Sequence, residues 1–239
     1  MTALLYRQDP YLQECEALVL AHTPEGGIIA DRSVFYPQGA GQPGDSGLLI
    51  WDQGRIVIAT TLRQPCGAVV LVPSAPAELP PRGVRIRQRI DWARRHRHMR
   101  MHTALHLLSV VIARPVTGGQ IGAGRGRLDF DMAEVPLSPQ GVEAALNALA
   151  SQDLAVSESW VTEAALSADP GLAALFADRA PAGPDRVRMI SIGEGAGRID
   201  FQPCGGTHVA RTGEIGTILV ERVEQKGRQC RRISLRLES

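Results

Sequence analysis

Two short segments about a hundred residues apart place the strongest constraint on how this chain can fold. Residues 102–106 read HTALH and residues 204–208 read CGGTH, so each segment has two metal-binding side chains four positions apart. Residues four apart on a helix share a face, and their imidazoles can reach one ion. If His102 and His106 are half of a metal site, the fold must bring Cys204 and His208 to the same point. The alternative is that both histidines are ordinary core or surface residues.

The second segment predicts a tight loop rather than a helix. Gly205 and Gly206 would each cost a helix about 1 kcal/mol relative to alanine. Pro203 fixes the backbone just before the cysteine, after an expected strand at residues 198–202. Three imidazole nitrogens and one thiolate form a set that zinc accepts in tetrahedral geometry, with all four as ligands or with a water replacing one. The alternative is a buried structural cysteine beside a turn. The predicted zinc ligands are His102, His106, Cys204 and His208.

The composition is that of an ordinary globular protein. The chain has 239 residues, 44% of them hydrophobic and 21% charged, with a formal net charge of +1. Four cysteines are too few for a disulfide framework in a chain of this length. There is no run of roughly 18 apolar residues, and the polar N-terminus lacks the features of a signal peptide. We therefore expect a cytoplasmic protein without a membrane segment.

The order of the expected elements predicts an α+β fold of two domains. A Gly- and Pro-rich segment at residues 35–47, FYPQGAGQPGDSG, is an expected loop, and the Pro-rich residues 73–83 suggest a boundary between domains at 1–80 and 84–239. We expect helices at about 93–113, 140–152 and 163–176. The expected strands are 14–21, 27–34, 48–51, 55–62, 69–72, 84–90, 127–132, 155–161, 186–192, 198–202, 215–225 and 228–237. Strands and helices do not alternate strictly, so a mainly antiparallel sheet is favoured.

Four motifs together resemble a known family. HTALHLL, CGGTHV, FYPQGAGQPGDSG and TGEIGTILVERVEQKG at residues 212–227 are similar to those of AlaX-type alanyl-tRNA editing proteins, in their medium-length form. The resemblance implies an N-terminal β-barrel-like domain and a C-terminal zinc-binding domain. It also implies hydrolysis of mischarged tRNA(Ala), chiefly Ser-tRNA(Ala), with Gly-tRNA(Ala) as a second candidate. Leu105 and Ala40 depart from the family pattern, and a methyl group at position 40 matters only if the backbone there has a positive φ.

Ester hydrolysis and serine selection would need polar groups beside the metal. Zinc can activate water, polarise the carbonyl or act as a template, and a pocket that hydrogen-bonds the seryl hydroxyl would reject alanine. Thr103, Thr207 and Gln42 are the candidate partners of substrate or water, although Thr103 could instead bond its own backbone and Gln42 could hold its loop together.

A cluster of arginines leads into the first histidine motif. Eight arginines lie between positions 82 and 100, with Asp91 as the only acidic residue among them. Arginine suits phosphate contacts, so this run predicts a tRNA-binding surface, unless the arginines pair with local acids. The loop glycines Gly39 and Gly41 could approach the acceptor stem through backbone amides. The arginines are Arg82, Arg85, Arg87, Arg89, Arg94, Arg95, Arg97 and Arg100, whereas nearby His96 and His98 are expected on a solvated basic face.

Two other functions remain compatible with the sequence. One is a non-catalytic tRNA-binding module with structural zinc, and the other is a zinc esterase that acts on a different aminoacyl-tRNA or a small ester. The partner expected from the family is the acceptor end of tRNA(Ala) carrying a wrong amino acid. No heptad pattern demands a coiled coil, so a monomer or weak dimer is expected.

Overall fold

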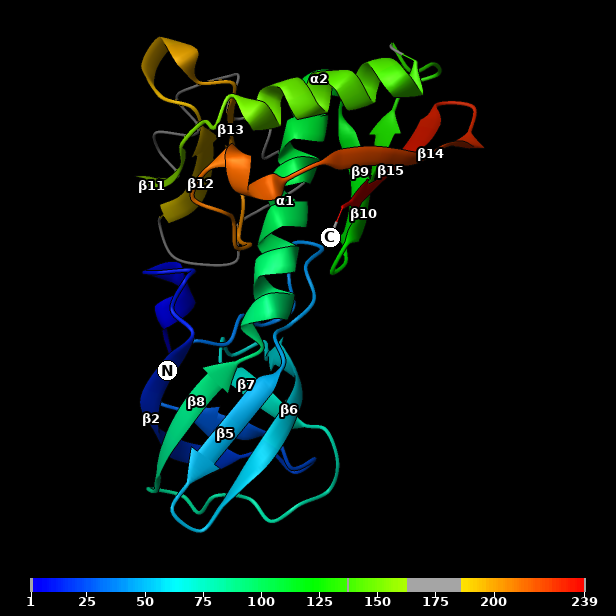
Figure 1. The fold of residues 1–239 in the computed structure, drawn as a ribbon. Helices are drawn as coiled ribbons and strands as arrows, with labels where there is room; N and C mark the ends of the chain where they lie inside the picture. Colours follow the sequence, from blue (N-terminus) through cyan, green and yellow to red (C-terminus); the bar gives the residue numbers. More distant parts are fainter. Residues whose placement is uncertain (1, 137, 163–185, 239) are drawn as a thin grey trace. The chain divides into compact units, whose positions relative to one another are not determined.

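The computed structural model describes residues 2–136, 138–162 and 186–238 and shows an α+β protein (Figure 1). Its contacts divide it into two compact units, Met1–Met99 with Ile121–Ala123 and Arg100–Gln120 with Gly124–Ser239. The helix expected near residues 163–176 lies outside the described residues. Within the described part of the chain, no helix has both the length and the apolar character that a membrane crossing requires.

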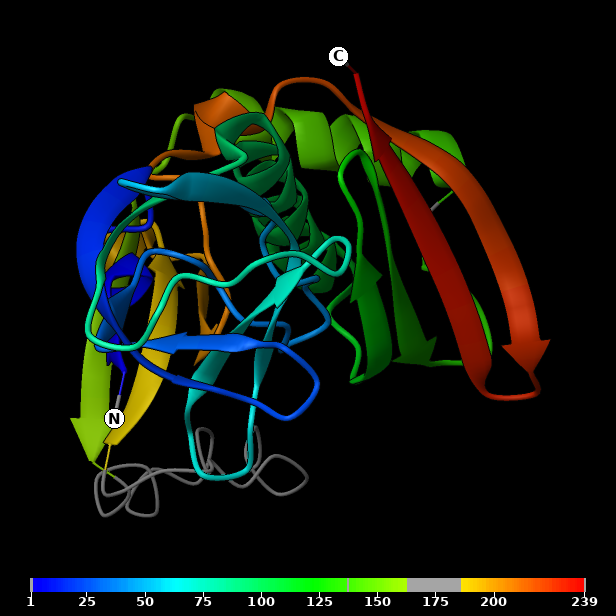
Figure 2. The same cartoon turned by 90° about the horizontal axis from the view of Figure 1, so that it is seen from below.

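The first unit is built on a closed barrel of six strands, seen from below in Figure 2 in blue and cyan. Closure leaves no exposed sheet edge, which removes the main aggregation hazard of a small β-structure. A 3-10 turn, η1 (Leu5–Arg7), and a short parallel pair, β1 (Ala3–Leu4) with β4 (Arg32–Ser33), accompany the barrel. In barrel order the strands are β2 (Glu14–His22), β3 (Ile28–Ala30), β7 (Val69–Pro73), β6 (Gly54–Arg63), β5 (Gly47–Trp51) and β8 (Arg85–Ile90).

Strand β8 closes the barrel, although it follows the Pro-rich segment that was expected to separate the domains. It pairs with β2 on one side and with β5 on the other. Its residues alternate, so Ile86 and Ile90 join the barrel core while the arginines between them face outward. The expected boundary, after residue 80, therefore lies before the last barrel strand, whereas the compact units separate after Met99 within helix α1 (Trp92–Ile112).

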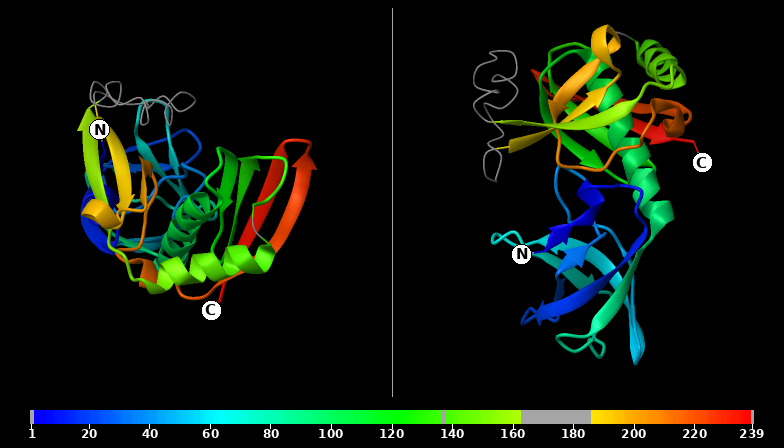
Figure 3. Two further views of the ribbon diagram at one scale, coloured as in Figure 1. Left: turned by 90° about the horizontal axis from the view of Figure 1, so that it is seen from above. Right: turned by 90° about the vertical axis from the view of Figure 1, so that its left-hand side faces the viewer.

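The second unit contains two antiparallel sheets, a second helix and the later part of α1. Figure 3 (left) shows this part of α1 between the two sheets, with α2 (Pro139–Ser151) along one edge. Ser138 caps α2 by accepting a hydrogen bond from the Gly141 amide, and Pro139 is its first residue. The larger sheet has the order β14 (Ile218–Gly227), β15 (Cys230–Leu237), β10 (Arg125–Asp131) and β9 (Val116–Ile121); the smaller has β11 (Val156–Thr162), β12 (Arg186–Ile192) and β13 (Asp200–Pro203). Short 3-10 turns are η2 (Gly195–Gly197) and η3 (Thr212–Ile215).

Strand β9 was not expected, because its two adjacent glycines suggested only the end of a helix. In the structure, Gly119 lies where a larger residue would crowd the neighbouring strand. A Cβ at Gly119 would lie 2.8 Å from Cδ2 of Leu128 on β10. On β10 itself, two residues before Leu128, a Cβ at Gly126 would lie 2.5 Å from Sδ of Met101. Helix α1 therefore packs directly against the backbone of β10. This close packing fixes the histidine-bearing part of α1 against the larger sheet.

Candidate metal centre

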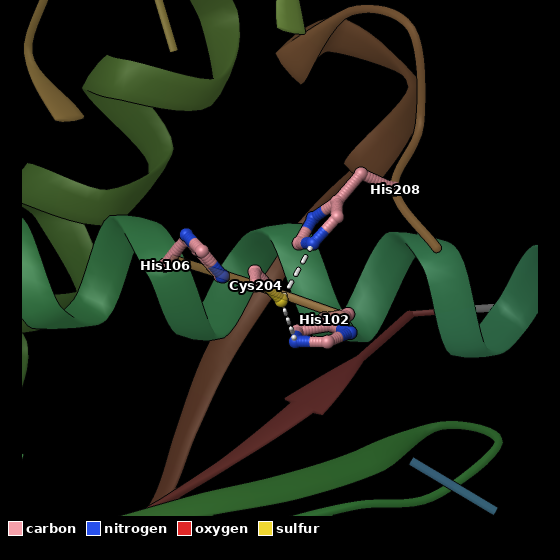
Figure 4. A group of neighbouring side chains, drawn as sticks. All are labelled: His102, His106, Cys204 and His208. Atoms are coloured by element: carbon pink, nitrogen blue, oxygen red, sulfur yellow. Dashed lines mark hydrogen bonds between the residues drawn. The ribbon is translucent and has the colours of Figure 1, made fainter. Parts of the chain in front are cut away.

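The two segments with metal-binding side chains meet in the second unit, as the sequence predicts. His102 and His106 project from one face of α1, and Cys204 and His208 come from the loop after β13 (Figure 4). One ligand atom from each residue lies within 4.8 Å of the others. The three histidines are buried, at 4–7% exposure. The segment is an irregular loop rather than a helix, as Gly205 and Gly206 predict.

The spacing of these atoms suits a tetrahedral metal ion. Sγ of Cys204 lies 3.3 Å from Nε2 of His102 and 3.3 Å from Nε2 of His208. Tetrahedral zinc with ordinary Zn–N and Zn–S bond lengths would separate neighbouring nitrogen and sulfur ligands by about 3.5 Å. The group can therefore hold a metal ion, and its donor set fits zinc.

A carboxylate holds the second histidine of the helix. Nδ1 of His106 lies 2.8 Å from Oδ2 of Asp200 on β13, which leaves Nε2 as the ligand atom. The Gln202 amide donates to both carboxylate oxygens of Asp200 and to the hydroxyl of Ser109. Neither Asp200 nor Gln202 was predicted from the sequence as part of the site. Their signal was the alternation Asp200-x-Gln202-x-Cys204, which places all three side chains on one face of a strand.

Thr103 holds the histidine of the loop. Its Oγ1 lies 3.1 Å from Nδ1 of His208 and accepts a hydrogen bond of 3.3 Å from the Val209 amide. With Nε2 of His208 turned to Cys204, its Nδ1–H donates to Thr103. The buried Thr103 thus positions His208, and its predicted contact with substrate or water, or alternatively with its own backbone, stays a prediction. Thr207 is also buried in the loop, while Gln42 belongs to the first unit, where its backbone pairs with Gly39.

Arg188 on β12 holds the backbone of the loop itself. Its Nη1 donates to the carbonyl oxygens of Cys204, at 3.0 Å, and Gly206, at 2.8 Å. Its Nε donates to Glu158 on β11 at 2.6 Å, so the buried charge is paired. An isolated arginine in a strand carries no sequence signal for this role, and it was not expected.

The pKa values of the clustered side chains are shifted by burial and by the charges of their neighbours. Burial opposes ionisation of Cys204, but the imidazoles of His102 and His208 hold its pKa well below the ordinary value. Burial and the neighbouring His102 lower the pKa of His208 far below its usual range. Burial also acts to lower the pKa of His106, but the hydrogen bonds and negative charges of Asp200 and Cys204 together outweigh it and raise this pKa to about 9. The cysteine is thus poised as a thiolate, the form that binds metals.

Most of the arginines expected to bind RNA have protein partners in the first unit. Arg85 and Arg87 pair with Glu16 and Glu14 on β2 while remaining exposed. Three others donate to backbone carbonyls, and Arg100 does so in the second unit. These pairs are Arg82 with Leu20, Arg94 with Gly44, Arg97 with Ala93, and Arg100 with Ile215. Arg89 is exposed on β8. Several of these arginines therefore pair with nearby protein groups, which is the alternative to RNA binding.

Arg95 cannot serve as a phosphate ligand, because its side chain is fully buried. Its Nε donates to Oδ2 of Asp45 at 2.8 Å, and its other nitrogens bond Asp45 and the carbonyl oxygens of Pro10 and Val34. The same Asp45 oxygen accepts from the Tyr36 amide at 2.7 Å. Arg95 thus fastens both ends of the Gly-rich loop to α1. Sequence alone could not separate this arginine from its exposed neighbours.

The Gly-rich loop contains a tight turn at the two glycines expected to approach RNA. The Gly39 amide donates to the Gln42 carbonyl and the Gln42 amide donates back to Gly39, so the Gly39 amide is already occupied. Ala40 has a φ of +49° and Gly41 a φ of +73°. The departure at Ala40 therefore falls at a position where a methyl group is unfavourable.

His98 is buried, which corrects the expectation of a solvated basic face. It is 1% exposed, and within the described residues its Nδ1 has no hydrogen-bond partner. Burial, followed by the charges of Arg94, Arg95 and Arg97, lowers its pKa to about 4. His96 is half-buried and stacks on Trp92, with ring centroids 5.3 Å apart.

Comparison with known proteins agrees with this arrangement. Residues 187–234, which include the CGGTH loop, match the family model of the threonyl and alanyl tRNA synthetase second additional domain. The fold and the His₃Cys cluster thus define a protein with this tRNA synthetase-associated domain. The chain is 34% identical to alanyl-tRNA editing protein AlaX-M of Methanosarcina acetivorans over 98% of both chains. It is 30% identical to AlaX-L of Pyrococcus horikoshii over 98% of this chain and 57% of that one. It is also 35% identical to alanine–tRNA ligase of Korarchaeum cryptofilum, over 94% of this chain and 25% of that one. The chain belongs to the AlaX-M type of alanyl-tRNA editing proteins.

Proposed function

We propose that this protein is a zinc-dependent aminoacyl-tRNA deacylase that acts in the cytoplasm on mischarged tRNA(Ala). Its chief substrate would be Ser-tRNA(Ala), with Gly-tRNA(Ala) as the second. The observation that carries the proposal is the His102, His106, Cys204 and His208 cluster in a chain that matches editing proteins along nearly its whole length. The partner is the acceptor end of the tRNA with the wrong amino acid attached.

The four clustered side chains would hold the zinc ion. When bound, zinc supplies a Lewis acid that polarises the ester carbonyl or lowers the pKa of a water molecule. The protein groups around it keep the ligands in place, because Asp200 orients His106 and Thr103 orients His208. Three-coordinate binding would leave the fourth position for water or substrate.

Selection of serine over alanine would come from a hydrogen bond to the seryl hydroxyl. A site that satisfies its own polar groups only with a hydroxyl can discriminate by up to ~10⁴-fold or more. Thr207, buried beside His208, is our first candidate for this contact, and Gln42 is the second. The exposed arginines Arg85, Arg87 and Arg89 on β8 and the neighbouring Arg82, Arg94 and Arg97 are proposed to contact tRNA phosphates.

The test is a paired deacylation assay on the metal-loaded protein. Metal content is measured first, and hydrolysis of Ser-tRNA(Ala) and Ala-tRNA(Ala) is then compared with that by a His102→Ala variant. We expect about one zinc per chain, fast hydrolysis of the seryl ester only, and loss of both metal and activity in the variant.

Other outcomes would favour the competing functions. Binding of tRNA without turnover, with unfolding on metal removal, would indicate a binding module with structural zinc. Hydrolysis of small esters that is insensitive to salt and needs no tRNA would indicate a general esterase. Equal hydrolysis of the seryl and alanyl esters would contradict the proposal.

A further inference from the structure

Trp160 lies in the same row of the smaller sheet as the metal-binding cysteine. It stands directly opposite Arg188 in the pairing of β11 with β12. On the other side of β12, the Cys204 amide donates to the Arg188 carbonyl at 3.1 Å. Neighbouring strands are about 4.8 Å apart, so the Cα atoms of Trp160 and Cys204 are about 10 Å apart. The alternation of side chains places Trp160, Arg188 and Cys204 on one face.

The side chain of Trp160 is partly exposed to solvent. The residue is 43% exposed, and it is the only aromatic among the large hydrophobic residues found exposed in the described part of the chain. The opposite face of the strand already supplies the packing, because Val161 joins a cluster with Val187 and Met189. Trp160 therefore lies on the face of β11 opposite to this cluster.

An exposed cation lies beside this ring on the same face. Arg186 is two residues before Arg188 on β12 and pairs with Thr162, two residues after Trp160 on β11. Residues two apart on a strand point to the same side, so Arg186 and Trp160 are diagonal neighbours. Their chemistry is complementary to a nucleotide, since an aromatic face stacks on a base and a guanidinium binds a phosphate.

We propose that Trp160 and Arg186 form the subsite for the terminal adenosine of the acceptor end. The adenine base stacks on the indole of Trp160, and Arg186 contacts the adjoining phosphate. Only a few bonds separate the ester carbonyl from the base, so a spacing of about 10 Å accommodates the ester at the metal and the base on the ring. This inference rests on the proposed function, because it assigns a place to the substrate of that site.

The direct test is a fluorescence measurement that does not depend on turnover. The probe is a tRNA(Ala) acceptor microhelix with 2-aminopurine as its terminal base and serine attached through a stable amide. Stacking of 2-aminopurine on an aromatic ring quenches its emission. We expect quenching on binding to the metal-loaded wild-type protein and to Trp160→Phe, and its loss with Trp160→Ala.

Affinity and salt dependence provide the second measurement. Loss of a stacked base should weaken microhelix binding about tenfold to a hundredfold in Trp160→Ala. Arg186→Ala should weaken binding and reduce the log–log salt slope by about one phosphate contact. Ser159→Ala is the matched control, because Ser159 is exposed on the opposite face of the same strand. Circular dichroism and metal content should be the same in all variants.

The outcomes separate this inference from the proposed function. If the wild-type protein hydrolyses Ser-tRNA(Ala) while Trp160→Ala keeps full quenching and affinity, the subsite is wrong and the function stands. If the wild-type protein binds no microhelix and hydrolyses no mischarged tRNA, the proposed function fails and the subsite with it.

Discussion

A carboxylate oxygen of Asp200 lies 2.8 Å from Nδ1 of His106, and both side chains are buried. Such a partner fixes the tautomer of a metal-binding histidine and raises its basicity, and its loss typically weakens metal binding 10- to 100-fold. We therefore expect Asp200→Asn to lower zinc affinity by about this factor. Competition with a chromophoric chelator at constant pH measures it.

The control for this change is Asp131→Asn, an identical acid-to-amide substitution at an exposed site on β10. It should leave zinc affinity unchanged. An Asp200→Asn protein that binds zinc as tightly as the control would show that the hydrogen bond does not tune the metal centre.

Thr103 offers an independent test of ligand positioning. Thr103→Val keeps the shape of the side chain but leaves the Nδ1–H of His208 and the Val209 amide without their acceptor. An unsatisfied buried donor costs about 1–3 kcal/mol, so the free energy of unfolding should fall by about this amount and zinc affinity should fall with it. Thr103→Ser keeps the hydroxyl and should retain both properties. Urea unfolding and chelator competition measure them, and equal behaviour of the two variants would contradict the assigned role.

The metal ligands could be predicted from sequence because their chemistry depends on residue type and short spacing. His102 and His106 follow the helical period, and the glycines after Cys204 indicate a loop. Asp200 could not be singled out in the same way, because a lone carboxylate on a strand is usually a surface residue. Its role depends on a contact with His106 across 94 positions of the chain, which only the fold supplies.

The same limit explains two other errors, one in each unit. Arg95 and its neighbours look alike in sequence, and only the buried Asp45, fifty positions away, distinguishes Arg95. Strand β9 was missed because two adjacent glycines usually interrupt structure, whereas here a Cβ at Gly119 would lie 2.8 Å from the Leu128 side chain on the neighbouring strand β10. Both cases depend on packing between elements rather than on local preference.

The burial of His98 predicts a specific pH dependence of stability. Its pKa is lowered to about 4 in the folded protein, against about 6.5 in the unfolded chain. The unfolded state therefore binds the proton first, so this contribution is complete above pH 6.5 and is lost as the pH falls towards 4. The shift corresponds to about 3 kcal/mol.

His98→Gln removes the titrating group and should flatten this part of the pH profile. Urea unfolding of the metal-free wild type and variant at pH 7 and pH 4.5 measures the difference between the two slopes. Metal-free protein is used so that pH-dependent release of the metal does not contribute to the slopes, and the free ligands titrate equally in the wild type and the variant. Identical slopes would show that His98 does not titrate differently in the folded and unfolded states.

Ala40 predicts a stabilising substitution in the Gly-rich loop. Its φ of +49° places an exposed alanine in a region that favours glycine. We expect Ala40→Gly to raise the free energy of unfolding by about 0.5–1 kcal/mol, because relief of backbone strain outweighs the added entropy of the unfolded chain. Ala144→Gly, at an exposed interior position of α2, should have the opposite sign and cost about 1 kcal/mol. Urea unfolding of both variants measures the two effects, and a destabilised Ala40→Gly protein would show that position 40 does not carry this strain.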